Sequence, residues 1–229
     1  MARAVWLGRF AYEPAAALQE DLRAAILAGA APDTLLLCEH DPVVTLGKRA
    51  RPEHLLLPAE ELTRQGIAVH TASRGGEATY HGPGQLVAYP VLRLRQGVRA
   101  HVEGMAQAVI DLLATFGVLG AWRADEPGVW VEDAKICAFG VHVRHGVAVH
   151  GLALNLQLPP ERFGIIVPCG KPDGRVTSLH RHASDVPDCA TAAPLLARAL
   201  GRALALEFHP ASPESVEQVR IAKARSSPI

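Results

Sequence analysis

The sequence carries no excess of charge and few aromatic residues. Its 229 residues contain 23 Lys and Arg against 23 Asp and Glu, so the formal net charge is zero, and Phe, Trp and Tyr make up only 5%. A large net charge would indicate attraction to nucleic acid or to a membrane surface. We therefore expect no nucleic-acid or membrane partner, and any charged partner must be met by a local patch.

Long apolar runs are absent as well. The first ten residues, MARAVWLGRF, lack the apolar core of a signal peptide, and no run approaches the roughly 20 apolar residues of a membrane span. These features predict a cytoplasmic protein. The cysteines, Cys38, Cys137, Cys169 and Cys189, form no C-x-x-C pair. In a reducing compartment this pattern predicts free thiols and argues against a disulfide framework or a zinc knuckle.

Several common catalytic motifs are missing. The patterns G-x-S-x-G, H-E-x-x-H, G-x-x-x-x-G-K-[ST] and G-x-G-x-x-G do not occur, which disfavours common hydrolases, zinc proteases, P-loop enzymes and dinucleotide binders. The histidines His180 and His182 offer two metal ligands without an evident third, so we expect a polar loop there and no metal site.

Helical and strand patterns are mixed without regular alternation. Apolar residues at helical spacing predict helices at 14–28 and 98–116, and a third from about 191 to 206. Short β-rich runs lie between and after the first two, and the run at 135–158 is long enough for a hairpin that turns at RHG. The mixture predicts a single α+β domain, residues 1–229, with a mixed, largely antiparallel sheet. We expect the polar tail at 210–229 to be frayed.

A glycine-rich loop is the most distinctive stretch. Residues 74–85 read RGGEATYHGPGQ, with four glycines between two predicted strands. Glycine lets a backbone approach a ligand closely and adopt angles closed to other residues. We expect the loop to be a wall laid against something bound, with its glycines making room and Tyr80 and His81 ordering the polar end.

Of the thiols, Cys169 has the surroundings that favour reactivity. In IIVPCGKPDG it follows an apolar run and a proline and precedes a glycine, so we expect it to be exposed at a strand end. Cys38 and Cys137 lie inside apolar runs and read as small core residues, and Cys189 begins a predicted helix. A nearby cation lowers the pKa of a thiol. Lys135, at the start of a predicted strand, is a candidate for that cation, although it also reads as a solvated lysine at a hairpin end.

Two histidines, His81 and His150, are set among small residues. Each reads either as a hydrogen-bonded structural residue or as a participant in chemistry, and the local sequence leaves both open.

The distinctive stretches occur together in one known family. RGGEATYHGPGQ is similar to that family's R-G-G-x-x-T-Y-H-G-P-G-Q loop without a gap. PGVWVEDAKICAFG resembles its P-G-[LV]-[WY]-V and K-I-x-x-x-G segments, and VHGLALN and IVPCG follow in the family's order. Over residues 36–179 the chain thus resembles the octanoyl-[acyl carrier protein]:protein N-octanoyltransferases of lipoate biosynthesis.

This resemblance implies a fold and a site. The fold would be the module shared with biotin and lipoate protein ligases. Cys169 would be the nucleophile that takes the acyl group as a thioester, and Lys135 would lower its pKa. The implied substrate pocket is lined by Arg74, Gly75, Gly76, Glu77, Ala78, Thr79, Tyr80, His81, Ala138, Phe139, Gly140, Gly151, Leu152 and Ala153.

The resemblance also implies partners. The donor would be octanoyl-acyl carrier protein, which carries the acyl group on phosphopantetheine. The acceptors would be lipoyl domains of 2-oxoacid dehydrogenase E2 subunits and the glycine cleavage H protein. No cofactor is expected, because a thiolate takes an acyl group from a thioester without ATP. We expect Arg93, Arg95 and Arg99 either to help dock an acidic carrier or to form a solvated basic face.

Two other functions stay open at this point. One is an ATP-dependent lipoate-protein ligase, which shares the fold and the strand lysine. The other is a non-catalytic binder of acylated carrier or lipoyl domains, which needs no reactive thiol.

Overall fold

Two β-sheets organise the computed structural model, which describes residues 1–168 and 174–219. Cys169 lies outside the described residues. The helices are α1 (Tyr12–Leu27), α2 (Ala59–Arg64), α3 (Gly97–Ala114) and α4 (Cys189–Ala203). The strands are β1 (Ala2–Arg9), β2 (Thr34–Glu39), β3 (Val43–Leu46), β4 (Ala68–Thr71), β5 (Ala78–His81), β6 (Gln85–Arg93), β7 (Ala121–Arg123), β8 (Gly128–Val131), β9 (Ala134–Arg144), β10 (Val147–Asn155) and β11 (Phe208–Ala211).

The larger sheet is mixed. Its order is β11-β1-β2-β6-β10-β9-β8-β7. Strand β1 runs parallel to both of its neighbours, and the remaining pairs are antiparallel. The predicted α+β class with a mixed, largely antiparallel sheet is confirmed.

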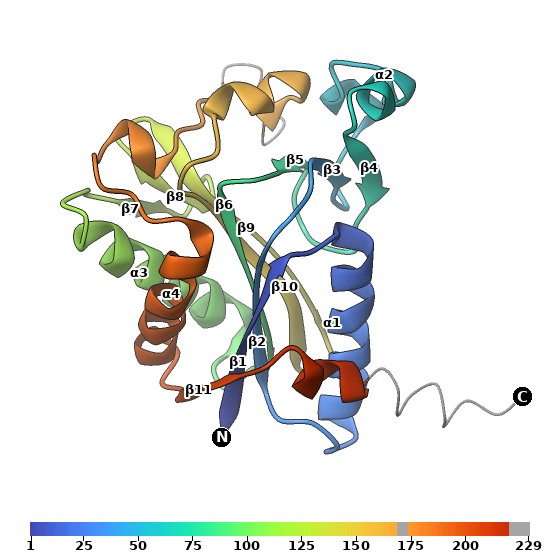
Figure 1. Cartoon of the computed structure of the whole chain (residues 1–229), viewed down its shortest axis with the longest axis vertical. Helices are drawn as coiled ribbons and strands as arrows, with labels where there is room; N and C mark the ends of the chain where they lie inside the picture. Colours follow the sequence, from blue (N-terminus) through green and yellow to red (C-terminus); the bar gives the residue numbers. More distant parts are fainter. Residues whose placement is uncertain (169–173, 220–229) are drawn as a thin grey trace, which may run out of the picture.

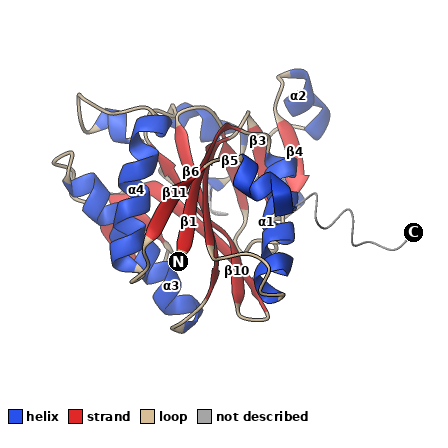
Figure 2. Cartoon of the chain, turned by 60° about the horizontal axis from the view of Figure 1, so that its bottom comes forward, coloured by secondary structure: helices blue, strands red, loops and turns tan. Residues whose placement is uncertain are grey.

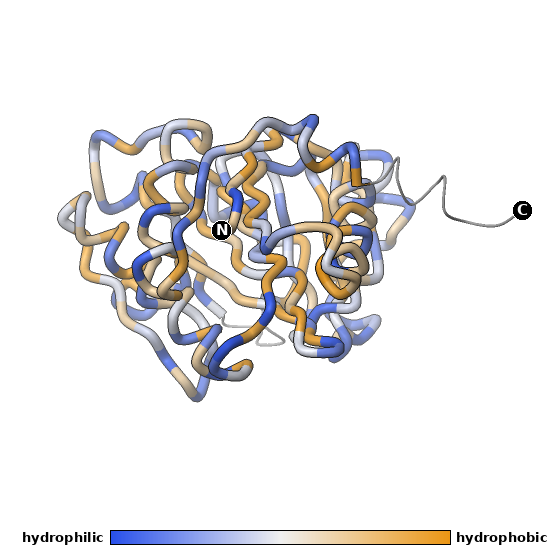
Figure 3. The backbone as a smooth tube through the Cα atoms, turned by 90° about the horizontal axis from the view of Figure 1, so that it is seen from below, coloured by the Kyte–Doolittle hydropathy of each residue, from blue (hydrophilic) through white to orange (hydrophobic). Residues whose placement is uncertain are grey.

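Helices cover both faces of this sheet. Helix α1 lies on one face, and α3 and α4 lie together on the other (Figures 1 and 2). Successive side chains of a strand point to opposite faces, and β2 shows this directly. Leu35 and Leu37 join the core under α3 and α4, while Leu36 and Cys38 join the core under α1. Such a two-sided strand is apolar throughout, which is why TLLLC shows no alternation. Hydrophilic segments lie at many of the outer turns (Figure 3).

The smaller sheet has the order β4-β3-β5 and sits beside α2 (Figure 1). Its own apolar cluster includes Val44, Tyr80 and Phe163, and the rings of Tyr80 and Phe163 meet edge to face at 5.9 Å between centroids. The glycine-rich loop begins between β4 and β5 and ends at β6, so it connects this sheet to the larger one.

The predicted helices are present with shifted ends. The buried face of α1 includes Ala15, Leu18, Leu22 and Ile26, which is the helical spacing that predicted it. Helix α3 begins at Gly97, within a residue of the prediction. Helix α4 begins two residues before the predicted start at 191, because the Asp188 side chain accepts a hydrogen bond from the Thr191 N–H and caps it.

The predicted hairpin is β9 and β10. Arg144 pairs with Val147 across the turn, and both turn residues, His145 and Gly146, have positive φ, 51° and 77°. Two consecutive left-handed residues define the tight turn whose twist matches a β-hairpin.

The expectation of a frayed tail from residue 210 is wrong for residues 210–219. Ala211 pairs with Val5, the side chain of Val216 is 2% exposed, and Arg3 donates a hydrogen bond to the Ser215 carbonyl at 2.9 Å. Edge strand β11 contains Pro210 and exposed residues, so its sequence lacks the apolar alternation that reveals a strand. Residues 220–229 lie outside the described part of the chain.

Candidate active site

A cavity of about 710 Å³ lies between the start of α1, the glycine-rich loop and strands β6, β9 and β10. Its volume is in the range of ligand pockets, roughly 300–1,000 Å³. Every residue predicted to line the substrate pocket contributes to its wall except Tyr80, and Lys135 does so too. The structure thus brings these residues, from segments far apart in the chain, to the wall of one cavity.

The glycine-rich loop closes the cavity along an unpaired edge of β9. Strand β8 pairs with β9 only as far as Ala138. Beyond that point the Gly75 N–H donates to the Val141 carbonyl at 3.3 Å. A Cβ on Gly140 would lie 2.9 Å from Cδ of Arg74, so glycine at 140 leaves the space that the Arg74 side chain occupies.

Arg74 holds this loop to the smaller sheet. Its Nη2 donates to the carbonyl and to Oγ1 of Thr45 at 2.6 and 2.7 Å, and its own carbonyl accepts from the Lys48 N–H at 3.1 Å. The side chain is 9% exposed. A buried guanidinium with several acceptors fixes the backbone around it, so Arg74 makes a rigid wall of a segment rich in glycine.

Tyr80 does not line the cavity, in contrast to its predicted place. It is 1% exposed and packs in the small-sheet cluster, because alternation along β5 sends Thr79 and His81 to the cavity and Tyr80 to the opposite face. Gly82 and Gly84 also serve packing and not the cavity. A Cβ at Gly82 would lie 2.7 Å from the Tyr80 hydroxyl, and one at Gly84 would lie 2.7 Å from the backbone of Gln157.

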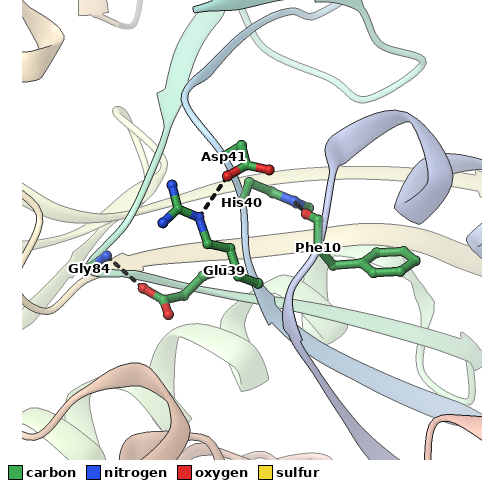
Figure 4. A network of polar contacts seen from close by, with 6 residues as sticks. Phe10, Glu39, His40, Asp41 and Gly84 are labelled. Atoms are coloured by element: carbon green, nitrogen blue, oxygen red, sulfur yellow. Dashed lines mark hydrogen bonds and ion pairs between the residues drawn. The ribbon is translucent and has the colours of Figure 1, made fainter. Parts of the chain in front are cut away.

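The end of the glycine-rich loop is hydrogen-bonded to the β2–β3 connection, which links the two sheets. The Gly84 N–H donates to Oε1 of Glu39 at 2.7 Å, and Nδ1 of His40 lies 2.5 Å from the Phe10 carbonyl (Figure 4). Arg9 and Asp41 form an ion pair at 2.7 Å beside them. The β2–β3 connection is therefore held on both sides, which fixes where the loop ends.

Buried histidines and tyrosines form the polar end of the cavity. The ring of Tyr12 stacks on that of His81, with centroids 6.2 Å apart and planes at 11°. Nδ1 of His81 lies 2.7 Å from Oε1 of Gln85, and Nε2 of His40 lies 2.7 Å from the Tyr89 hydroxyl. The imidazoles of His40 and His81 and the Tyr89 hydroxyl thus have hydrogen-bond partners, whereas the buried Tyr12 hydroxyl has none among the described residues.

These histidines are neutral at neutral pH. Burial, with help from the neighbouring His40, lowers the pKa of His81 to about 3. Burial and then the Arg74 guanidinium lower the pKa of His150 to about 4. Nε2 of His150 lies 2.8 Å from the Ser73 hydroxyl. Both histidines therefore line the cavity as uncharged, hydrogen-bonded residues.

Lys135 lies where the cavity meets the chain that flanks Cys169. The residue is 6% exposed, its Nζ donates to the Pro127 carbonyl at 3.2 Å, and Nζ lies 4.9 Å from the centre of the Trp130 ring. Its N–H donates to the Arg175 carbonyl at 2.9 Å, and its carbonyl accepts from Thr177 at 3.0 Å. The alternative of a solvated lysine at a hairpin end is wrong, because the ammonium is buried.

A second, small cavity of about 20 Å³ joins Lys135 to both sides of the undescribed segment 169–173. It is lined by Lys135, by Pro168 on one side of that segment and by Val176 on the other. Of these two neighbours, Val176 also forms a backbone bridge with Lys135, whereas Pro168 shares only the lining of the small cavity.

The three described cysteines are not poised to react. Cys38, Cys137 and Cys189 are buried, and burial raises the pKa of each thiol well above its usual value. Ionisation of such a buried thiol is strongly unfavourable, so little thiolate is present and the thiol is a poor nucleophile at neutral pH. The prediction that Cys38 and Cys137 are core residues is confirmed.

Sequence and structure comparisons can now be set beside this geometry. The family model described as the lipoyl protein ligase A/B catalytic domain matches residues 11–201. The chain belongs to this family. An octanoyltransferase of Chloroflexus aurantiacus is 46% identical over 208 residues, which cover 88% of this chain and 93% of the relative. A mitochondrial octanoyltransferase of Arabidopsis thaliana is 44% identical over 182 residues, covering 77% of each chain.

Solved structures of the lipoyl protein ligase A/B family share the fold. A lipoate-protein ligase A bound with ATP matches with a TM-score of 0.76 at 18% identity, over 99% of this chain and 95% of that one. Protein Ta0514 of T. acidophilum with bound lipoic acid matches with the same TM-score and identity. These likenesses confirm the predicted fold, and the octanoyltransferase relatives place the chain among the transferases of the family.

Three aromatic residues of the cavity wall were not predicted from the sequence. Tyr12, Tyr89 and Trp122 line the cavity. Tyr12 reads as the start of an amphipathic helix, and Trp122 lies in a strand of three residues. Tyr89 did carry a signal, because a hydroxyl inside the apolar run QLVAYPVL must find a partner when buried.

The predicted arginine patch is divided in the structure. Arg93 donates to the Ile26 carbonyl at 2.6 Å and so ends helix α1. Arg99 lies at the rim of the cavity, where it pairs with Glu103 at 2.8 Å. Of the three predicted arginines, only Arg99 borders the cavity, and Arg95 is exposed outside its wall.

Metal and membrane features can be stated for the described residues only. Within residues 1–168 and 174–219, no group of three or more His, Cys, Asp and Glu side chains is arranged to hold a metal ion. Nε2 of His182 lies 2.8 Å from the Thr177 hydroxyl. In the same ranges no helix is both long and apolar enough to cross a membrane.

Proposed function

We propose that the protein transfers an octanoyl group from acyl carrier protein to a lysine of a lipoyl domain through a thioester on Cys169. Family membership and the octanoyltransferase relatives support the acyl transfer. A solved relative of the fold is described with its E2 lipoyl domain, which supports this class of acceptor. We place the reaction in the cytoplasm, because free thiols persist in a reducing compartment.

The position of Lys135 carries the proposal. Lys135 is 6% exposed at the cavity wall, residues 175 and 177 are hydrogen-bonded to its backbone, and Pro168 lines the same small cavity as its side chain. In the sequence Cys169 directly follows Pro168. The three described thiols are buried with raised pKa values, so none of them competes for the role.

In the first step the Cys169 thiolate attacks the carbonyl carbon of the octanoyl thioester. A new C–S bond forms, the bond to the pantetheine sulfur breaks, and the leaving thiolate takes a proton from the Lys135 ammonium. One thioester is exchanged for another, so the step needs no ATP.

In the second step the neutral amine of the acceptor lysine attacks the Cys169 thioester. An amide bond forms, the bond to the Cys169 sulfur breaks, and the proton lost by the amine goes to the neutral Lys135 side chain. The thiolate and the ammonium are both restored, so the enzyme is ready for another donor.

The cavity is suited to the acyl chain. Its wall includes Val87, Ala138, Phe139 and Leu152, and the uncharged histidines close its polar end. Burying the seven carbons beyond the carbonyl at about 0.8 kcal/mol each contributes about 6 kcal/mol to binding. We expect no cofactor in this reaction.

Intact-mass analysis tests the proposal. The protein mixed with octanoyl-acyl carrier protein, without ATP or acceptor, should gain one octanoyl group that hydroxylamine removes and that maps to the peptide containing VPCGK. Addition of an apo-lipoyl domain should move the group to that domain. Cys169→Ser should abolish the adduct, because a serine hydroxyl is far less ionised than a thiol, and Cys38→Ala should keep it.

Other outcomes identify the alternatives. An adduct that persists in Cys169→Ser would show that the wrong thiol is assigned. Strict dependence on ATP with free octanoate would indicate a ligase. Binding of octanoyl-carrier protein with neither adduct nor transfer would indicate a non-catalytic binder.

A further inference from the structure

We propose that Trp130 is a positioning residue for Lys135, acting through the face of its indole ring and through the loop that the ring anchors. The inference rests on the proposed function, because it assigns a device that places the ammonium of the proposed Cys169–Lys135 pair.

The register of the sheet puts the two residues opposite each other. Trp130 in β8 pairs directly with Lys135 in β9. The register shifts between Val129 and Trp130, where Val129 pairs with Cys137, so one residue of β9 is left over as a bulge. A bulge turns a side chain away from the direction that regular pleating gives it. Here it brings the lysine arm and the indole to the same side, and Trp130 is 5% exposed.

One direct contact and two hydrogen bonds to the same loop link the indole and the ammonium. Nζ of Lys135 lies 4.9 Å from the centre of the Trp130 ring, within the distance at which a cation is attracted to an aromatic face. Nε1 of Trp130 donates to the Glu126 carbonyl at 3.1 Å. The next carbonyl along the chain, that of Pro127, accepts the hydrogen bond from Lys135. The indole therefore contacts the ammonium and also holds the loop whose Pro127 carbonyl accepts the hydrogen bond from Lys135.

The backbone around the pair leaves space for this arrangement. A Cβ on Gly128 would lie 2.7 Å from Cε of Lys135 and 3.1 Å from Nε1 of Trp130. A Cβ atom essentially never lies within 3.0 Å of another non-bonded heavy atom, so any side chain at 128 would displace the Lys135 side chain. Gly128, Trp130 and Lys135 form one packed unit whose effect is to give the ammonium a single position.

A double-mutant cycle separates this role from general packing. Trp130→Leu should lower the single-turnover rate of octanoyl adduct formation at saturating donor about tenfold, with a smaller change in the donor concentration needed for half-saturation. In a Lys135→Met background the same substitution should have no further effect, because the group it positions is gone. Trp130→Tyr, which keeps an aromatic face, should recover most of the rate.

Control variants guard against misfolding. Trp6→Leu removes a half-buried indole from β1, far along the sheet from Lys135, and should leave the adduct rate unchanged. If Trp130→Leu does not fold, Gly128→Ala provides the same test with the indole intact, and it should lower the rate by displacing the lysine arm. A rate unchanged in Trp130→Leu or in Gly128→Ala, or lowered equally in the Lys135→Met background, would overturn the proposal.

Alkylation by iodoacetamide keeps the two proposals distinguishable. At fixed pH the labelling rate of Cys169 reports the fraction of thiolate, whatever the natural acyl donor is. Trp130→Leu should slow this labelling several-fold, and Trp6→Leu should not. If octanoyl donors give no adduct while this pattern holds, the proposed function fails and the role of Trp130 stands. If the adduct forms normally in Trp130→Leu and labelling is unchanged, the role of Trp130 fails alone.

Discussion

Mild acid should destabilise this protein strongly, because three of its buried histidines resist protonation. His81, His101 and His150 are each 6% exposed, and burial is the leading cause that lowers their pKa values, to about 3, about 4 and about 4. In the unfolded chain a histidine has a pKa of about 6.5. Each site therefore takes up a proton on unfolding at any pH between its folded and unfolded values.

The sign and size of the effect follow from this difference. Where the unfolded state binds more protons, the free energy of unfolding falls as the pH falls. At pH 5 an unfolded histidine is almost fully protonated, while one with a pKa of 4 or below is almost fully neutral. Between pH 7 and pH 5 each site should lower the free energy of unfolding by about 2 kcal/mol, and the three together by about 5–6 kcal/mol. Much of the decrease should occur below pH 6, and it should end near pH 3.

Urea denaturation at pH 7 and pH 5 measures this loss. His101→Leu gives an internal check, because His101 lies in α3 and has no part in the cavity wall, and its Nε2 is buried without a hydrogen-bond partner among the described residues. This variant should lose about 2 kcal/mol less than the unsubstituted protein over the same interval. Free energies of unfolding that agree within 1 kcal/mol at the two pH values would refute the reasoning.

Four further results are expected. Cys137→Ala should leave the octanoyl adduct intact in mass spectra and cost about 1 kcal/mol in urea denaturation, since Cys137 is only a core residue. Gly151→Ala should lower the free energy of unfolding by about 3 kcal/mol or more, and with it the melting temperature, because the new Cβ would lie 2.2 Å from a carbonyl oxygen of β6. Gly164 has open space around it, so Gly164→Ala should leave the melting temperature unchanged. Arg99→Glu should slow transfer from carrier protein while sparing a small octanoyl thioester, with the difference shrinking in added salt. Arg93→Glu should instead reduce stability by about 1 kcal/mol, since it ends α1.

Local signals in the sequence predicted most of the elements, since their causes are local. The apolar spacing of α1 and the His145–Gly146 turn act within a few residues, so pattern and composition reveal them. Strand β1 was missed because its burial does not alternate. Of its residues only Ala2 and Val5 are buried, so its sequence shows no period of two.

The candidate site was predictable to the extent that its residues share a stretch with a distinctive pattern. The glycine-rich loop and the two β9–β10 segments are such stretches. Tyr80 shows what such a pattern does not predict. Whether a residue of the pattern faces the cavity depends on the pleat of β5 and on the packing of Phe163. Trp122 shows another limit. It lies in a strand of three residues and meets the ring of Phe139 in β9 edge to face, with centroids 5.6 Å apart, and no local signal marks that contact.

The edge of β9 that β8 leaves unpaired bears on the proposed transfer between two protein substrates. Exchange between two thioesters is nearly balanced in free energy, so the enzyme gains most by fixing the reacting groups in place and not by supplying energy. In strand β9 the first half fixes the position of Lys135 and the second half borders the cavity. Its first residues are paired on both sides, by β8 and by residues 175–177, and there Lys135 is held. Its later residues lack a β8 partner, and there the glycine-rich loop and the cavity lie. Rigid placement of the ammonium and room for an acyl chain thus come from one strand, because its partner strand ends half-way along it.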